Sequence, residues 1–503
     1  MASGIATRKR PRFISRLASL VGYGVLIPLL LVTSALVFRY LQTRFFYAPL
    51  PVERLEEKGA YLGAVPTVAP DQVPNFVVIF FDDLGWGDLS SYGNRLIRTP
   101  RIDALATEGV RMTNFYSASP VCTPSRAALL TGRLPSRTRT EINVFFPDTH
   151  PFGVLRQMMG WGNELPRDEI LLPEALGAAG YATGMVGKWH LGGTPGHRPN
   201  DFGFDSWLGV LWSNDMTPLH VYRDGEIEQE DRREAPWSVF RDADEDRGDG
   251  IDQRRLTERY TDEAIDFLQR NSDRPFFLYF AHTFPHVPHF ASREHAGRSA
   301  GGVYGDVVED LDRSVGAVLD ALDRLGLREK TFVIVTSDNG AAYNGSPGPL
   351  RGRKGETYEG GQRVPMIARW PGRIPAGVVT DEMAMNIDLF PTLLGAAGLP
   401  LPDDREIDGR DLRPLLEGRS GSPHDVLYFL SAWTGEVEAV RGARFKYRAA
   451  SGDMGRSKRQ LWLLGSDAEA HNLAAMHPEA ALRLAGQLDH WRASVETNPR
   501  GWR

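Results

Sequence analysis

The sequence predicts an α/β fold in which a large mixed, mostly parallel β-sheet is sandwiched between layers of helices. Two observations predict it. Continuous apolar runs recur along the chain, as expected of strands that are buried on both faces of a sheet. Between these runs lie segments whose apolar residues repeat at helical spacing, and several of the segments end in glycine. The C-terminal part has shorter apolar runs, which predict a smaller antiparallel α+β subdomain.

The first element is an apolar segment near the N-terminus. Residues 17–38 contain no charged side chain, and the basic flank that precedes them is heavier than the one that follows. Such a segment can cross a bilayer as a helix, with the more basic flank in the cytoplasm. We therefore expect a cytoplasmic segment (1–16), a transmembrane signal anchor (17–38) and an extracytoplasmic remainder, which is periplasmic, luminal or extracellular. The alternatives are a secreted protein whose signal peptide is cleaved near Ala35, and a merely buried helix.

The remaining elements follow in chain order. Residues 39–74 are rich in proline and are predicted to be a linker, 75–415 the α/β domain and 416–503 the C-terminal subdomain. The predicted strands of the large sheet are 76–81, 182–187, 276–281 and 332–337, and the predicted helices are 100–109, 172–180, 259–270, 306–326 and 388–398. The subdomain is predicted to contain strands within 426–430, 436–450 and 460–465 and a closing helix over 478–494.

Composition excludes some functions and raises a question about one residue. The formal net charge of −6 gives no support to a general nucleic-acid surface, so we expect no nucleic-acid partner. Cys122, in ASPVCTPSRAALLTGR, is the only cysteine in 503 residues. It therefore has no partner for a disulfide within the chain, and no cluster of cysteine and histidine surrounds it as in a zinc site. Cys122 is either an inert buried residue or a chemical group in its own right.

Polar pairs follow two of the predicted strands directly. Asp82 and Asp83 follow 76–81, and Asp338 and Asn339 follow 332–337. Ligands of parallel sheets bind beyond the carboxyl ends of the strands, and a hard cation such as Ca²⁺ or Mg²⁺ takes carboxylate and amide oxygens as ligands. Either pair alone is better explained as a turn cap, because a glycine follows nearby. Two such pairs at equivalent strand ends favour a metal site.

Histidines and basic residues follow the other strands. Lys188 and His190 come after 182–187, and HTFPHVPH after 276–281 contributes His282, His286 and His289. The loop 350–365 is rich in glycine and basic residues and contains Lys354. Structural histidines and a solvated loop are the simpler explanations. Together with the acidic pairs and Arg126, however, this set suits a tetrahedral oxyanion ester.

The motifs resemble those of the type I, formylglycine-dependent sulfatases of the alkaline-phosphatase superfamily. CTPSR followed by AALLTGR resembles the signature of that family, and FDDLGWGD, GKWHLG, PHVPH, TSDNG and GRKGETYEGGQRVP agree with it in order and spacing. The resemblance covers roughly residues 74 to 475 and is strongest to the arylsulfatase A and N-acetylgalactosamine-6-sulfatase branch. It implies an alkaline-phosphatase-like sheet and a sulfuric ester hydrolase that acts on a sulfated small molecule or a sulfated glycan.

The resemblance also implies roles for individual residues. A separate formylglycine-generating enzyme would oxidise Cys122 to Cα-formylglycine, whose hydrate attacks sulfur and forms a sulfo-enzyme intermediate. One Ca²⁺ would be held by Asp82, Asp83, Asp338 and Asn339, and Asp338 would help to remove the proton of the attacking hydroxyl. The other implied roles belong to Arg126 (holding the hydrate), Lys188 and Lys354 (binding sulfate), His286 (protonating the leaving alcohol, alone or with Lys354), His190 (base for sulfate release) and Ser213 (substrate binding).

Three rival functions remain at this point. A phosphonate monoester or phosphodiester hydrolase of the same superfamily would use the same groups. A non-enzymatic membrane protein is disfavoured because every expected catalytic position is filled. A thiol-nucleophile phosphatase normally needs C-x-x-x-x-x-R, whereas the spacing from Cys122 to Arg126 is C-x-x-x-R.

Overall fold

The computed structural model describes residues 24–38, 54–159, 162–232, 250–450, 458–465 and 468–503. The strands of its large sheet are β1 (Asn75–Phe81), β2 (Val110–Tyr116), β3 (Ala182–Lys188), β4 (Ser206–Val210), β5 (Val221–Arg223), β6 (Glu226–Gln229), β7 (Phe276–Ala281), β8 (Thr331–Ser337), β9 (Arg363–Arg369) and β10 (Val378–Met385). The main helices are α2 (Leu55–Ala64), α3 (Pro100–Thr107), α4 (Cys122–Thr131), α5 (Pro151–Met158), α6 (Leu172–Ala178), α7 (Leu256–Arg270), α8 (Gly302–Arg324), α9 (Glu359–Gln362), α10 (Leu389–Ala396), α11 (Arg413–Leu416) and α12 (Pro478–Thr497).

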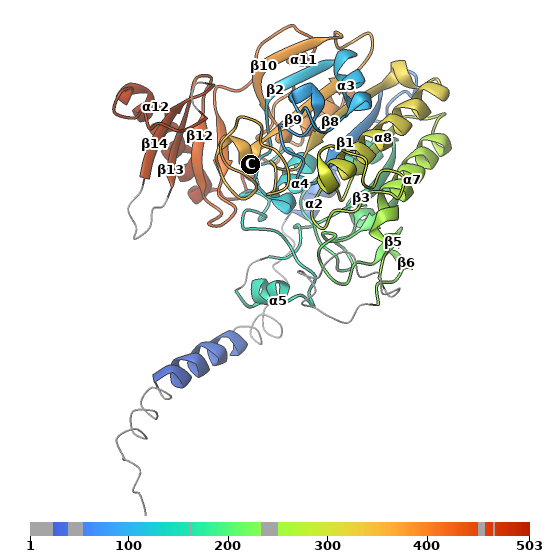
Figure 1. Cartoon of the computed structure of the whole chain (residues 1–503). Helices are drawn as coiled ribbons and strands as arrows, with labels where there is room; N and C mark the ends of the chain where they lie inside the picture. Colours follow the sequence, from blue (N-terminus) through green and yellow to red (C-terminus); the bar gives the residue numbers. More distant parts are fainter. Residues whose placement is uncertain (1–23, 39–53, 160–161, 233–249, 451–457, 466–467) are drawn as a thin grey trace, which may run out of the picture.

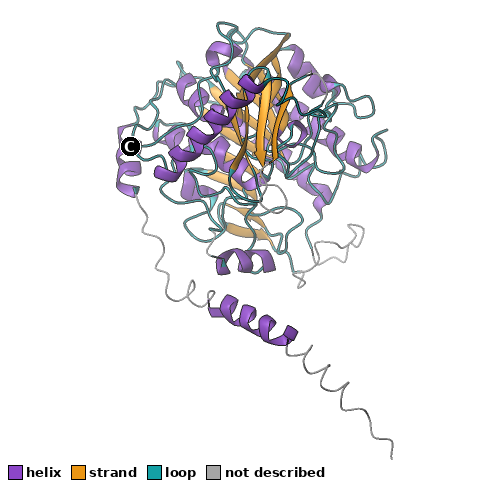
Figure 2. Cartoon of the chain, turned by 90° about the vertical axis from the view of Figure 1, so that its left-hand side faces the viewer, coloured by secondary structure: helices purple, strands orange, loops and turns teal. Residues whose placement is uncertain are grey.

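The ten strands form one mixed sheet in the order β10-β2-β9-β8-β1-β7-β3-β4-β5-β6 (Figure 1). The centre, β8-β1-β7-β3-β4, is parallel, and β9, β5 and β6 pair antiparallel with their neighbours. Helices lie on both sides of the strands (Figure 2). The predicted fold class is confirmed.

The central strand shows why the apolar runs are continuous. All residues of β1 are buried. Phe76, Val78 and Phe80 share one core with α4, α6 and α10, whereas Val77 and Ile79 share the opposite core with α3, α7 and α8. Because successive side chains of a strand point to opposite faces, burial on both faces requires apolar residues at every position.

The C-terminal sheet is antiparallel, with the order β11 (Leu427–Leu430), β12 (Val437–Arg441), β13 (Phe445–Ala450) and β14 (Lys458–Leu463). Helix α12 covers it through Leu484, Leu488 and Trp491, which are buried and lie at helical spacing. The same core includes Tyr116 of β2 and Ala128 of α4, so the small sheet packs directly on the large domain. This agrees with the predicted antiparallel α+β subdomain.

The chain end returns to the large domain. Arg500 forms ion pairs with Asp168 and Glu169, and Trp502 pairs with Arg405 in an isolated β-bridge. The last residues of the chain therefore contact the large domain, although they follow the small sheet in sequence.

The expected linker at 39–74 needs a correction. Residues 55–64 form helix α2, which packs against α6. Lys58 is buried, donates to the carbonyl oxygens of Arg167 and Glu169, and pairs with Glu174 at 2.6 Å. The helix is anchored by this polar contact rather than by a long apolar stripe, so the periodicity of its sequence did not reveal it.

The expected membrane anchor lies only partly within the described residues. Residues 24–38 are helical, whereas residues 1–23, including the beginning of the expected span, lie outside the described residues. Within the described part of the chain, no helix has the length and apolar character needed to cross a membrane.

Candidate active site

The candidate site lies where the central parallel strands end. Asp82 follows β1, Asp338 follows β8, Lys188 ends β3, and the segment with His286 follows β7. Because these strands run parallel, their carboxyl ends meet at one edge of the sheet. Helix α4 begins at this edge, which brings Cys122 to the same place.

Cys122 is the first residue of α4 and is almost completely buried. Val121 before it is extended, and the thiol donates to Asp82 Oδ1 at 3.2 Å. Burial, and then the carboxylates of Asp338 and Asp82, raise the pKa of the Cys122 thiol well above its usual value. A thiol held in its neutral form is a poor nucleophile, which argues against a thiolate mechanism.

Asp82 is connected to the candidate substrate-binding residues. Lys188 Nζ donates to Asp82 Oδ2 and, at 3.1 Å, to Ser213 Oγ. Ser213 Oγ lies 3.5 Å from His286 Nδ1. Burial alone would raise the pKa of Asp82, but Lys188, His286, Arg126 and Lys354 outweigh it, so that this pKa lies well below the usual range. Asp82 is therefore ionised.

Asp83 joins the loop residue Lys354 to the end of β8. Lys354 Nζ donates to Asp83 Oδ2 at 2.9 Å, and Asn339 Nδ2 donates to Asp83 Oδ1 at 2.8 Å. His286 Nε2 lies 3.6 Å from Asp83 Oδ2. Asp83 has a left-handed backbone, with φ of 70°, which is uncommon outside glycine and fixes the direction of its carboxylate.

The cluster has the donors that a hard cation requires. Ligand atoms of Asp82, Asp83, Cys122 and His286 lie within 4.8 Å of one another. The amide oxygen Oδ1 of Asn339 is buried and has no hydrogen-bond partner within the described residues. An unpaired buried oxygen beside two carboxylates fits a cation that takes oxygen ligands. The residues present therefore fit a metal ion.

Asp338 and Arg126 form a buried ion pair beside this cluster. Arg126 donates to Asp338 Oδ2 from Nε at 3.2 Å and from Nη2 at 2.9 Å, and from Nη1 to the carbonyl oxygen of Lys188. Asp338 Oδ1 accepts the backbone N–H of Asp83. Burial, and then the charge of Asp82, raise the pKa of Asp338 to about 7. A carboxylate with a raised pKa is a better proton acceptor than one with its usual value.

His190 is held as a neutral imidazole. Its Nε2 lies 2.9 Å from the carbonyl oxygen of Phe145, which can only accept, so Nε2 carries the proton. Nδ1 is buried and has no partner among the described residues. Burial, and then Lys188, hold the pKa of His190 well below its usual value. Nδ1 is thus a free proton acceptor.

The other two histidines of the 282–289 segment have different surroundings. His282 stacks on Phe81, and neither of its ring nitrogens has a hydrogen-bond partner within the described part of the chain. Burial lowers its pKa to about 3, so His282 is a neutral core residue. His289 lies 3.3 Å from the amide of Asn344 and belongs to the rim of the site. Only His286 of the three reaches the metal cluster.

Two supports of the site were not predicted from the sequence. Thr123 Oγ1 donates to the carbonyl oxygen of His190 and accepts the N–H of Phe145. One hydroxyl therefore positions both the backbone of His190 and the residue whose carbonyl oxygen bonds its imidazole. Farther away, Lys446 of β13 pairs with Glu359 at 3.0 Å, and Glu469 accepts the N–H of Glu359. This buried contact anchors the loop that carries Lys354 to the small sheet. It joins residues far apart in sequence, so no local pattern could reveal it.

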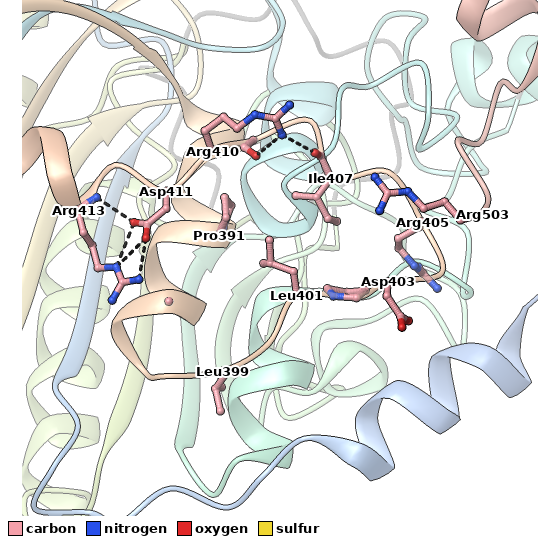
Figure 3. A pocket seen from close by; sticks show the side chains of 13 residues that line it. Pro391, Leu399, Leu401, Asp403, Arg405, Ile407, Arg410, Asp411, Arg413 and Arg503 are labelled. Atoms are coloured by element: carbon pink, nitrogen blue, oxygen red, sulfur yellow. Dashed lines mark hydrogen bonds and ion pairs between the residues drawn. The ribbon is translucent and has the colours of Figure 1, made fainter. Parts of the chain in front are cut away.

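The hollows elsewhere in the molecule are separate from the site. One, of about 530 Å³, lies beside α10 and the segment that follows it (Figure 3). Its arginines already have partners: Arg413 pairs with Asp411, and Arg410 donates to backbone carbonyl oxygens (Figure 3). None of the candidate catalytic residues lines it.

Comparison with known proteins agrees with the site. The family model described as Sulfatase matches residues 74–399, and the one described as N-sulphoglucosamine sulphohydrolase, C-terminal, matches residues 353–446. N-acetylgalactosamine-6-sulfatase of Canis lupus familiaris is 42% identical over 392 residues, which cover 74% of this chain and 70% of the relative. Arylsulfatase A of Homo sapiens is 40% identical over 419 residues, covering 78% and 77%.

A solved structure extends this likeness to the fold. The PsFucS1 sulfatase from Pseudoalteromonas sp. superposes with a TM-score of 0.72 at 26% identity and covers 90% of this chain and 96% of its own. The extent of the family match and the identity to the curated relatives are both high enough to assign a family. The chain belongs to the sulfatase family and is a sulfuric ester hydrolase.

Proposed function

We propose that this sulfatase cleaves the sulfate ester of a small molecule or a glycan by using a formylglycine made from Cys122. The observation that carries the proposal is the enclosure of Cys122 at the start of α4, in hydrogen-bond contact with Asp82 and close to buried cationic groups. The N-terminus of a helix favours an anion, as a sulfate ester requires. A separate formylglycine-generating enzyme is the partner that this proposal implies.

The charges of the site favour an added cation. Asp82, Asp83 and Asp338 are matched by Lys188, Lys354 and Arg126. Because three carboxylates and three cationic side chains balance, an incoming sulfate ester needs further positive charge. Bound Ca²⁺, held by Asp82, Asp83, Asp338 and Asn339, would supply that charge and stabilise the charge that develops on the sulfate oxygens.

The proposed mechanism assigns one task to each side chain. A formylglycine hydrate at residue 122 would supply two hydroxyls. One would attack sulfur while the bond from sulfur to the alcohol oxygen breaks, and deprotonation of the second would expel sulfate and restore the aldehyde. Asp338 would accept the first proton, and Arg126, which donates to Asp338 Oδ2, would hold the attacking group. Lys188 and Lys354 neutralise the sulfate oxygens, with Ser213 beside them.

Two histidines complete the proton transfers. His286 would donate to the leaving alcohol through Nε2 as an imidazolium, because its Nδ1 lies 2.6 Å from the carbonyl oxygen of Val287 and keeps the proton of that hydrogen bond. The carboxylate of Asp83, 3.6 Å from Nε2, would stabilise that cation. Lys354 shares the neighbourhood of Asp83 with His286 and can assist. His190 accepts the second proton at Nδ1, which is free within the described residues. The two histidines are thus assigned opposite roles because a carbonyl oxygen bonds Nδ1 of His286 but Nε2 of His190.

Hydrolysis of paired esters tests this proposal. The purified, matured enzyme is expected to hydrolyse 4-nitrophenyl sulfate at least about a hundredfold faster, as kcat/KM, than 4-nitrophenyl phosphate or phenyl phosphonate monoesters. The balanced site, with one added cation, suits the single charge of a sulfate ester better than the double charge of a phosphate monoester. The phosphonate monoester has the same single charge as the sulfate ester, so it tests recognition of the three sulfate oxygens rather than of charge. A higher kcat/KM for the phosphonate or for a phosphodiester would instead assign the chain to the alternative hydrolase class.

We also propose that the catalytic domain works outside the cytoplasm, anchored by residues 17–38. Support comes from the uncharged apolar segment and its basic flank in the sequence. Protease added to intact cells or spheroplasts is expected to digest the catalytic domain and to leave a cytoplasmic marker intact. Release of the active enzyme into the soluble extracytoplasmic fraction would indicate signal-peptide cleavage, and digestion only after lysis would contradict the orientation.

A further inference from the structure

The turn between β11 and β12 lies at the rim of the active site. The carbonyl oxygen of Ala432 accepts the N–H of Asn143 at 2.8 Å. A side chain at Gly435 would begin within 2.9 Å of both Glu141 and Ile142, so the turn packs tightly on this segment. The segment leads directly to Phe145, whose carbonyl oxygen holds His190.

Trp433 projects from this turn beside Lys354. The indole ring lies against Gly355, where a side chain would begin 3.8 Å from Trp433 Nε1 and Cζ2. Gly355 N donates to the carbonyl oxygen of Pro120, two residues before Cys122, and Lys354 reaches inward to Asp83. Trp433 thus contacts the residue that follows Lys354, the side chain proposed to bind sulfate.

The depth of the site determines what can lie beside Trp433. Cys122, Lys188 and His190 are at most 1% exposed, whereas the side chain of Lys354 is 22% exposed and Trp433 is 72% exposed. The inner site is therefore buried and would enclose the sulfate group of a bound ester. The organic part of an ester must extend from it toward the rim, where Lys354 and Trp433 lie.

Two hydrogen bonds fix the backbone of the turn that carries Trp433. Ser431 N donates to the carbonyl oxygen of Glu436, and Gly435 N donates to that of Ser431. Gly435 has φ of 72°, the left-handed conformation that favours glycine in a tight turn. A tryptophan with few rotatable bonds on a fixed turn offers a large flat surface at low entropic cost.

We propose that Trp433 is a specificity-determining residue that stacks on the ring of the organic group carrying the sulfate, either a sugar ring or an aryl ring. The inference rests on the proposed sulfate ester hydrolysis and extends it to the alcohol part of the substrate. Both kinds of ring can lie on the indole, an aryl ring through its flat face and a sugar ring through the C–H groups on one side of its chair. Its contact at the rim is with Gly355, which takes no part in proton transfer, so we expect Trp433 to contribute to binding rather than to chemistry.

Steady-state kinetics of Trp433→Ala tests the proposal. The KM for 4-nitrophenyl sulfate or for a monosaccharide sulfate is expected to rise about tenfold, which corresponds to about 1.4 kcal/mol, with kcat within about twofold of the wild type. The inhibition constant of inorganic sulfate, which occupies only the inner site, is expected to stay unchanged. Trp433→Phe is expected to restore most of the affinity, because it keeps a ring.

A control variant distinguishes loss of the stacking contact from a general disturbance of the C-terminal subdomain. Leu482→Ala removes another exposed apolar side chain of the same subdomain, 71% exposed on α12, and is expected to leave KM unchanged. An effect on only one of the two esters supports the proposal and identifies the kind of ring. An unchanged KM for both esters, or a parallel rise in the inhibition constant of sulfate, overturns it. Wild-type turnover of the same esters is read separately and tests the proposed function itself.

Discussion

Replacing Cys122 by alanine is expected to remove nearly all sulfatase activity from a protein that still folds. The side chain is enclosed at the start of α4, so loss of one sulfur atom leaves only a small cavity and costs about 1 kcal/mol of stability. The loss of kcat is expected to be about a thousandfold or more, because the nucleophile has no substitute in the site. Turnover of 4-nitrophenyl sulfate and thermal unfolding of both proteins measure the two effects.

Cys122→Ser distinguishes an aldehyde hydrate from a simple hydroxyl. Serine has nearly the size of cysteine, so packing is preserved. It has one hydroxyl and lacks the second one through which sulfate is released. We expect this variant to be nearly inactive and to accumulate a stable sulfate ester on residue 122, visible by peptide mass. Cys122→Ala is expected to be equally inactive without trapping sulfate.

A matched control and a chemical probe complete this experiment. Thr131→Ala, in the same helix, removes a buried hydroxyl that donates to the carbonyl oxygen of Ala127 and accepts the N–H of Arg133. Neither partner belongs to the candidate site, so this variant is expected to retain activity. The active wild type is expected to react with a hydrazide and to resist iodoacetamide. Near-normal turnover by Cys122→Ala would mean that Cys122 is inert and that the proposed mechanism is wrong. Inhibition by iodoacetamide would indicate a thiol nucleophile instead.

The strand ends were the most predictable part of the site. Asp82 and Asp338 each follow a continuous apolar run, and continuous runs predict parallel strands whose carboxyl ends meet. The pairs 82–83 and 338–339 are then expected to lie close together because β1 and β8 are parallel, and the structure places them in contact. The roles of these residues stay predictions, because geometry gives their contacts and not their chemistry.

The remaining features depend on contacts that have no local pattern. Strands β2, β9 and β10 carry partly exposed or mixed residues, so their runs were not distinctive. The anchoring of the Lys354 loop by Lys446 and the packing of Trp433 on Gly355 join residues about 80 positions apart. Helix α2 was missed because its single buried side chain is a lysine. Each of these features is decided by tertiary packing.

The pair of carboxylates is expected to make the enzyme depend on calcium. Asp83→Ala removes a carboxylate that lies between Lys354, Asn339 and His286. We expect the calcium content to fall from about one ion per chain to nearly none, and kcat/KM to fall about a thousandfold. Added calcium is expected to raise the melting temperature of the wild type but not that of the variant, because only a folded site with its ligands gains stability from binding.

The control for Asp83→Ala must be another buried carboxylate away from the cluster. Asp312 of α8 accepts the backbone N–H groups of Arg101 and Ile102, so Asp312→Asn is expected to lower stability while leaving calcium content and kcat/KM near the wild-type values. Loss of metal by both variants would point to general unfolding. If chelation and dialysis leave the turnover of the wild type unchanged, the metal site is misassigned. Three cationic side chains would then have to balance both the carboxylates and the substrate, although all three already form ion pairs with those carboxylates.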